Sequence, residues 1–195
     1  MKKNFLLPVL FLACVAGSLR AGNPPGLPST AMQSDRSERL ELYINVDESG
    51  VDEYPATISV YTKDIRSGKI TYILTSNPRA DIGWQQMKGT KNAIEVTSND
   101  IPAIEKAVFL PGCDNLILIE GCPDARNIYT YVIDTDKQKV LRFPTTEGLL
   151  YFEPDERLIH LSSYRYRAEG GRYSVDMAYT YEGIFVNEAE MEMEE

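Results

Sequence analysis

From residue 39 onward, apolar side chains recur mainly at every second position, which is the spacing of a β-strand. Residues 58–63 alternate in this way, the polar stretch from Asp64 to Gly68 interrupts them, and residues 70–74 resume the alternation. Two such runs joined by a glycine-containing loop are typical of a β-hairpin. The chain is therefore predicted to be all-β and built from antiparallel hairpins.

A second hairpin of the same form is predicted at residues 128–143, with the polar stretch 134–138 as its turn. Asp64 and Asp134 open the two turns, where an aspartate side chain commonly accepts backbone N–H bonds. Asp134 and Asp136 also have the spacing that begins a calcium loop. The glycine and the distal glutamate of such a loop are missing, so the sequence favours a turn.

The C-terminal part predicts a three-stranded meander over residues 158–167, 172–181 and 185–194. For the first pair of strands we expect Arg167 opposite Arg172, which places His160 opposite Tyr179. This register gathers the tyrosines of the meander on one face, either as a stacking platform for sugars or, more in keeping with their alternation, as core and cross-strand pairs. These tyrosines are Tyr164, Tyr166, Tyr173, Tyr179 and Tyr181.

For the second pair we expect a register that places Phe185 opposite Tyr181 and Met191 opposite Val175. A slip of one residue exchanges the two faces of a strand. The neighbouring register would turn Glu188 and Glu190 toward the apolar face, so the apolar pattern favours the first one.

Residues 77–105 break the alternation and contain the only tryptophan, Trp84. We expect this stretch to be an irregular insertion that packs one aromatic side chain on the sheet. Long ordered loops often carry binding sites, so Trp84 is the candidate ligand-contact residue.

The N-terminus predicts export. Residues 1–21 combine two lysines, an apolar run and small residues in the order of a signal peptide. Cleavage is expected near Ala21, and lipidation of Cys14, which follows a lipoprotein-like Phe-Leu-Ala stretch, is the alternative. Residues 22–37 are rich in proline and serine and predict a flexible linker, so the single all-β domain is expected at residues 38–195.

The net charge of the chain argues against some classes of binding partner. Removing residues 1–21 takes away three cationic residues and no acidic one, so the formal net charge changes from −9 to −12. An anionic protein is a poor partner for nucleic acid or anionic membranes. No segment of the sequence has the length and apolarity of a transmembrane helix.

Cys113 and Cys122 remain after export and flank an apolar run, residues 116–119, that reads as a buried strand. A strand of this length separates its ends by on the order of 20 Å, whereas a disulfide needs Cα atoms within about 7 Å. We therefore expect no disulfide between these cysteines, which should lie at opposite edges of the sheet.

His160 is the only histidine, which excludes metal sites built from several histidines. Ser162, Ser163 or Cys113 could pair with it as a nucleophile, but its place within a strand favours a structural role. The sequence carries no glycine-rich phosphate loop, and we assign no catalytic residue, metal ligand or cofactor. Acidic residues are numerous, so a hydrolase that uses a pair of carboxylates is an alternative.

One motif occurs twice. Residues 109–117 and 152–159 each place an aromatic residue and a proline before a polar turn and an apolar strand, with Phe109 and Phe152 43 positions apart. This spacing is close to that of a propeller blade, and residues 152–159 resemble the repeat of TolB-type periplasmic β-propellers.

The resemblance covers about two and a half repeat units, with Gly112 in place of the family's aspartate. It implies blade-like units but no particular activity. Three units do not close a ring, which needs about four or more blades. We therefore expect an open or folded-over arrangement, an incomplete propeller or a sandwich, rather than a closed propeller.

These observations predict an exported, non-catalytic module of the bacterial cell envelope that binds a protein or a glycan. It is expected in the periplasm, at the cell surface or outside the cell. The alternatives are a secreted, glycan-directed hydrolase that uses carboxylates and a purely structural envelope component.

Overall fold

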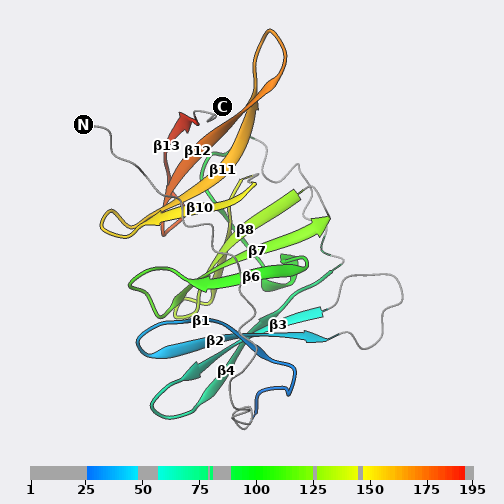
Figure 1. The fold of residues 1–195 in the computed structure, drawn as a ribbon, viewed down its shortest axis with the longest axis vertical. Coiled ribbons are helices and arrows are strands. Elements are labelled where there is room, and N and C mark those ends of the chain that lie inside the picture. Colours follow the sequence, from blue (N-terminus) through cyan, green and yellow to red (C-terminus); the bar gives the residue numbers. More distant parts are fainter. Residues whose placement is uncertain are drawn as a thin grey trace, which may run out of the picture.

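The computed structural model describes residues 26–47, 57–78, 80, 89–124, 127–144 and 147–191, which form three antiparallel sheets stacked in a row (Figure 1). The N-terminal sheet has the order β1 (Met32–Arg36), β2 (Leu40–Asp47), β3 (Thr57–Asp64) and β4 (Ile70–Thr75). The C-terminal sheet has the order β10 (Gly148–Glu153), β11 (Leu158–Tyr166), β12 (Arg172–Thr180) and β13 (Phe185–Glu190).

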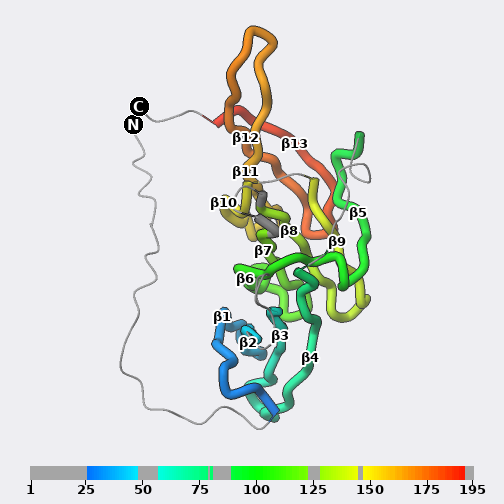
Figure 2. The backbone as a smooth tube through the Cα atoms, turned by 90° about the vertical axis from the view of Figure 1, so that its right-hand side faces the viewer, coloured from blue at the N-terminus to red at the C-terminus, as the bar shows by residue number. Residues whose placement is uncertain are grey.

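The middle sheet has five strands in the order β5-β9-β8-β7-β6. Their bounds are β5 (Ile94–Val96), β6 (Ile104–Phe109), β7 (Leu116–Asp124), β8 (Asn127–Asp134) and β9 (Lys139–Arg142). None of the sheets formed by the described residues closes into a barrel, and the row has two open ends (Figures 1 and 2). The predicted all-β, blade-like and open architecture is confirmed.

Both faces of the middle sheet are buried, and each face belongs to a different hydrophobic core. Ile117 and Ile119 of β7 pack toward Leu42 and Val60 of the N-terminal sheet. Leu118, on the other face of β7, packs in the core that contains Leu161 of the C-terminal sheet. A strand buried on both faces needs apolar residues at successive positions, which accounts for the unbroken apolar run at residues 116–119.

The predicted hairpin turns are confirmed. An oxygen of Asp64 accepts the backbone N–H groups of Arg66 and Ser67 at 3.1 and 2.7 Å. Asp134 does the same for Asp136 and Lys137 at 3.1 and 3.0 Å. Both aspartates therefore act as turn residues in equivalent hairpins, β3–β4 and β8–β9.

The repeated motif also has a structural meaning. Phe109 ends β6 before the turn into β7, and the second copy spans the turn from β10 into β11. Both copies thus join the edge strand of a sheet to its neighbour. Cys113 lies in the first of these turns and Cys122 lies toward the far end of β7, and the two do not form a disulfide, as predicted.

The predicted register between β11 and β12 is wrong by one residue. Tyr166, not Arg167, lies opposite Arg172, so His160 faces Ala178 instead of Tyr179. The loop of residues 167–171 is one residue longer than expected. Its two glycines at positions 170 and 171 adopt left-handed φ values of 99° and 83°, which glycine tolerates without steric cost.

The predicted register between β12 and β13 is also wrong. Phe185 lies opposite Tyr179, and Glu188 and Glu190 lie opposite Met177 and Val175. The expectation rested on the cost of burying the two glutamates. Glu188 is only partly buried there and forms an ion pair with Arg165 of β11, which offsets the cost. Glu190 stays exposed and pairs with Arg167 of the β11–β12 loop, so it carries little burial cost.

The structure corrects the expected linker and resolves part of the insertion. Residues 32–36 form β1, which pairs with β2, and Leu27 before it is only 8% exposed, so this part of residues 22–37 is ordered on the sheet. Within residues 77–105, β5 pairs with β9, and the short 3-10 helix η2 (Ser98–Asp100) follows. Figure 2 shows β5 at the margin of the middle sheet. The predicted signal peptide, Cys14 and Trp84 lie outside the described residues.

Candidate functional site

The open face of the C-terminal sheet carries the most unusual polar cluster among the described residues. Ile159 and Leu161 of β11 point into the core shared with the middle sheet. Their neighbours His160 and Ser162 therefore point to the opposite side, together with Asp176 of β12, which lies across from Ser162. We call this side the outer face.

A β-bulge aims Tyr151 at the outer face. Leu149 of β10 lies opposite Leu161 and packs against the core, whereas Tyr151 lies opposite His160, with a register shift between them. In a regular strand, positions 149 and 151 would share a face, and the extra residue at the bulge reverses this. Strand β10 is held in place just before the bulge, because the backbone N–H of Leu149 donates a hydrogen bond to the carboxylate of Glu120 in β7.

His160 lies at the centre of the cluster and is 8% exposed. Its Nδ1 is 2.9 Å from both carboxylate oxygens of Asp176, and its Nε2 is 3.3 Å from an oxygen of Glu153. The two carboxylates thus approach the imidazole from two sides. Both ring nitrogens are engaged, which fixes the plane of the ring.

Tyr151 stacks on this fixed imidazole. The ring centroids are 4.1 Å apart with an interplanar angle of 12°, and the hydroxyl donates to Asp176 at 3.1 Å. Burial of the hydroxyl end, with the charge and hydrogen bond of Asp176 and the charge of Glu153, raises the pKa of Tyr151 to about 12. The residue is nevertheless 49% exposed. One face of the phenol ring is therefore held against His160 while the residue remains accessible to a ligand.

The cluster does not form a nucleophile pair with the residues suggested by the sequence. Both nitrogens of His160 are held by carboxylates, so neither is directed at Ser162. Ser163 points to the opposite side of β11 and is bonded to Arg165. Cys113 lies in the β6–β7 turn, where its sulfur is 3.7 Å from Nη1 of Arg157.

The outer face continues along the β11–β12 hairpin, which extends beyond the rest of the sheet (Figure 1). Tyr164 and Tyr166 make an edge-to-face contact with ring centroids 5.5 Å apart, and Tyr166 is 74% exposed. The guanidinium of Arg172 lies 5.4 Å from the centre of the Tyr164 ring. This distal end is aromatic as well, with one cation beside it.

The predicted tyrosine cluster is thus split between two faces. Tyr179 and Tyr181 are buried in the core, with Tyr173 packed against it, while Tyr164 and Tyr166 are on the outer face. Sequence reasoning missed Tyr151, because alternation alone assigns it to the core side of β10. The sequence did contain one signal for this site: Tyr151 and Glu153 stand two residues apart, just before the proline of the repeat.

Clefts also lie elsewhere among the described residues, two of them at the turns between strands. One of about 490 Å³ is lined by Cys113, Asp134, Lys137, Arg157 and Tyr181 with their neighbours. The other, of about 740 Å³, lies between the β1–β2 and β6–β7 turns. The cations that line the first cleft already have anionic partners: Lys137 with Asp134, Lys139 with Glu95, and Arg157 with Glu182. These pairs weaken the case for a charged ligand there.

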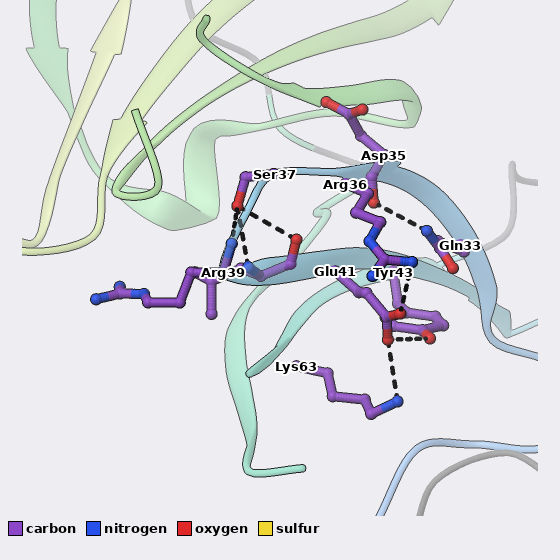
Figure 3. Close-up of polar contacts among 9 residues, drawn as sticks. Gln33, Asp35, Arg36, Ser37, Arg39, Glu41, Tyr43 and Lys63 are labelled. Atoms are coloured by element: carbon purple, nitrogen blue, oxygen red, sulfur yellow. Dashed lines mark hydrogen bonds and ion pairs between the residues drawn. The ribbon is translucent and has the colours of Figure 1, made fainter. Parts of the chain in front are cut away.

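A second polar cluster belongs to the N-terminal sheet (Figure 3). Glu41 accepts hydrogen bonds from the Tyr43 hydroxyl at 2.9 Å and from Lys63 at 3.0 Å, and its other oxygen is 3.8 Å from Arg36. Burial acts to raise the pKa of Glu41, but the bonds from Lys63 and Tyr43 and the two cations lower it overall. Glu41 is thus fully engaged within the protein, which indicates a structural role.

Comparisons with known proteins support the fold. No protein-family model matches the chain, and no curated protein matches it. A solved structure that it resembles is the β-propeller domain of the Trilobed protease from Pyrococcus furiosus, described as having an open velcro topology. The TM-score is 0.51 at 8% sequence identity, over 83% of this chain and 42% of that one. The likeness shows a propeller-like fold. This chain spans less than half the length of that neighbour.

The described residues contain no helix with the length and apolar character needed to cross a bilayer.

Proposed function

We propose that the protein is an exported, non-catalytic binding module of the bacterial cell envelope, which holds its ligand on the outer face of the C-terminal sheet. The observation that carries the proposal is the arrangement of Tyr151, whose ring is stacked on His160 and yet is 49% exposed. A tyrosine that is already ordered loses little side-chain freedom when it binds, which favours it as an anchor.

The support beneath this residue suits a binding site. His160 and Asp176 belong to paired strands, and β10 is tied to the middle sheet through the bond from Leu149 to Glu120. Groups placed on strands are held more firmly than groups on loops. A propeller-like fold is compatible with this role, because such folds present rigid surfaces for very different functions.

Export is part of the proposal and rests on the sequence of residues 1–21, with its basic, apolar and small-residue zones in order. Processing near Ala21 releases the module into the periplasm or beyond, whereas lipidation of Cys14 anchors it to a membrane. The N-terminal sheet and the outer face lie at opposite ends of the row of sheets (Figure 1).

A capture experiment tests the proposal. The mature protein is immobilised, exposed to a bacterial envelope extract, and compared with Tyr151→Ala and with Tyr72→Ala, which removes a tyrosine of similar exposure, 56%, from β4. Tyr151→Ala should lose the captured component, and Tyr72→Ala should retain it. Equal capture by all three proteins would contradict the proposal.

Trp84 stays a candidate ligand contact. If Trp84→Ala abolishes capture and Tyr151→Ala does not, the binding surface is the insertion and not the outer face. If nothing is captured by any variant, a purely structural role in the envelope is favoured instead.

A carboxylate-dependent hydrolase is the second candidate, because Asp176 and Glu153 both approach His160. Glycosidases place two carboxyl groups on either side of the bond they cleave. Here both are directed at a histidine on an open sheet face. Hydrolysis of envelope glycans by the mature protein, lost in Glu153→Gln, would favour this alternative over a binding module.

A further inference from the structure

We infer that the ligand of the outer face is a glycan chain of neutral or amino-bearing sugars, which stacks on Tyr151 and runs along β11 toward Tyr166. The inference rests on the proposed function, since it takes the outer face as the binding surface. It adds the chemical class of the ligand and its direction.

Tyr151 provides the first contact. The face of an aromatic ring carries partial negative charge and the edge partial positive charge. The C–H groups on one side of a sugar ring are therefore attracted to the face of a phenol. The 12° angle between Tyr151 and His160 shows that this phenol is held flat on the imidazole. A flat, supported ring matches the shape of a pyranose.

Hydrogen-bond acceptors lie beside this ring. The side chain of Glu153 is 47% exposed, and Asp176 already receives the Tyr151 hydroxyl. Carboxylate oxygens accept hydrogen bonds from hydroxyl or ammonium groups and repel other carboxylates. This end of the outer face therefore favours neutral or amino-bearing sugars over uronic acids.

The distal aromatic pair indicates an extended ligand. His160 and Tyr166 lie on the same strand and the same face, six residues apart, which corresponds to on the order of 20 Å. Tyr166 is 74% exposed and is packed only edge-on against Tyr164. A chain of several sugars can reach from one tyrosine to the other, whereas a disaccharide cannot.

The surface between the two ends is poorly suited to a protein partner. It is formed by Ser162, Ser174 and Asp176, which are short and polar. Protein interfaces place apolar and aromatic side chains at their desolvated centre. Here the aromatic residues are at the two ends, so hydroxyl-rich ligands fit the centre better. Arg172 at the distal end is 3.8 Å from Glu147, which offsets its charge.

Calorimetric titration of the mature protein tests the inference with three hexasaccharides: N-acetylglucosamine, glucosamine and galacturonic acid. We expect the first two to bind and the acidic hexamer to bind at least about tenfold more weakly. Tyr151→Ala should weaken binding about tenfold. Tyr151→Phe should bind, because it keeps the ring. Tyr72→Ala is the matched control and should bind like the wild type.

Length dependence tests the direction. Tyr166→Ala should weaken binding of the hexamers and leave binding of the corresponding disaccharides unchanged. Equal loss for both lengths, or none for either, would overturn the proposed path along β11. Preferential binding of the acidic hexamer would overturn the proposed class of sugar.

The two proposals fail in different ways. If no hexamer binds but an envelope protein is captured through Tyr151, the binding module stands and the glycan inference is wrong. If neither glycan nor protein binding responds to Tyr151→Ala, while circular dichroism shows this variant to be folded, both are wrong.

Discussion

Arg165 Nη2 lies 2.7 Å from an oxygen of Glu188, although the two residues belong to β11 and β13, which do not pair with each other. The guanidinium passes over the strand between them and lies 3.6 Å from the sulfur of Met177. The ion pair therefore spans three strands and compensates the charge of Glu188 beside an apolar residue. It stabilises the register that apolar patterning alone argues against.

Removing this arginine should destabilise the C-terminal sheet. Arg165→Met leaves Glu188 without its partner in a partly buried position, and we expect the free energy of unfolding to fall by about 1 kcal/mol. Combining it with Glu188→Gln should recover part of the loss. Urea unfolding of the two single variants and the double variant measures the coupling. Lys139→Met, which breaks the more exposed pair with Glu95, is the control and should change stability little. Additive effects of Arg165→Met and Glu188→Gln would show that the pair contributes nothing.

Gly183 is expected to be intolerant of any side chain. It has a φ of 80°, and an added Cβ would lie 2.5 Å from Cβ of Ala93. Gly112 has a similar φ of 74°, but an added Cβ there would meet nothing within 4 Å. Gly112→Ala should therefore cost about 1 kcal/mol from backbone strain alone. Gly183→Ala should cost about 1–3 kcal/mol more. Thermal unfolding of the two variants compares them, and equal losses would contradict the predicted clash.

The protein should lose stability at alkaline pH through Tyr43. Burial, with the hydrogen bond and charge of Glu41, raises the pKa of Tyr43 to about 12, from an ordinary value of 10.0. Between these values the unfolded chain releases a proton that the folded chain retains, so stability falls as pH rises. Tyr43→Phe should show a shallower decline between pH 10 and 12. Urea unfolding across this range measures the slope, and an unchanged slope would refute the assignment.

Reducing agents should leave the stability of the mature protein unchanged. Cys113 and Cys122 do not form a disulfide, so there is no cross-link for a reductant to remove. Alkylation in denaturant without prior reduction should modify both thiols, as measured by mass spectrometry. Modification that requires reduction would show that the two cysteines had been oxidised.

Local patterns predicted the hairpins and turns well, because Asp64 and Asp134 need only neighbouring backbone groups to form their turns. Strand registers depend on longer-range information. The β11–β12 register follows from the five-residue loop 167–171, and the β12–β13 register is stabilised by the ion pair of Glu188 with Arg165, two strands away. Apolar periodicity shows neither the loop length nor this ion pair, so both predicted registers were wrong.

The candidate site depended on a feature that alternation cannot show. Without the bulge between Leu149 and Tyr151, the tyrosine would face the core. His160 was recognised as a residue within a strand, but its partners Asp176 and Glu153 come from two other strands. The cluster can therefore be predicted only when the registers of β10, β11 and β12 are known.

Among the residues that the structure describes, none belongs to both cores, although each core includes side chains from the middle sheet. Loss of either end sheet therefore exposes only one face of that sheet, whereas melting of the middle sheet removes the support of both. The arrangement is that of a short linear array with nearest-neighbour coupling. Amide hydrogen exchange should accordingly be slowest at Leu118 and Ile119, and the end sheets should open first. A ligand on the outer face would then protect the end sheet to which it binds before it affects the rest of the molecule.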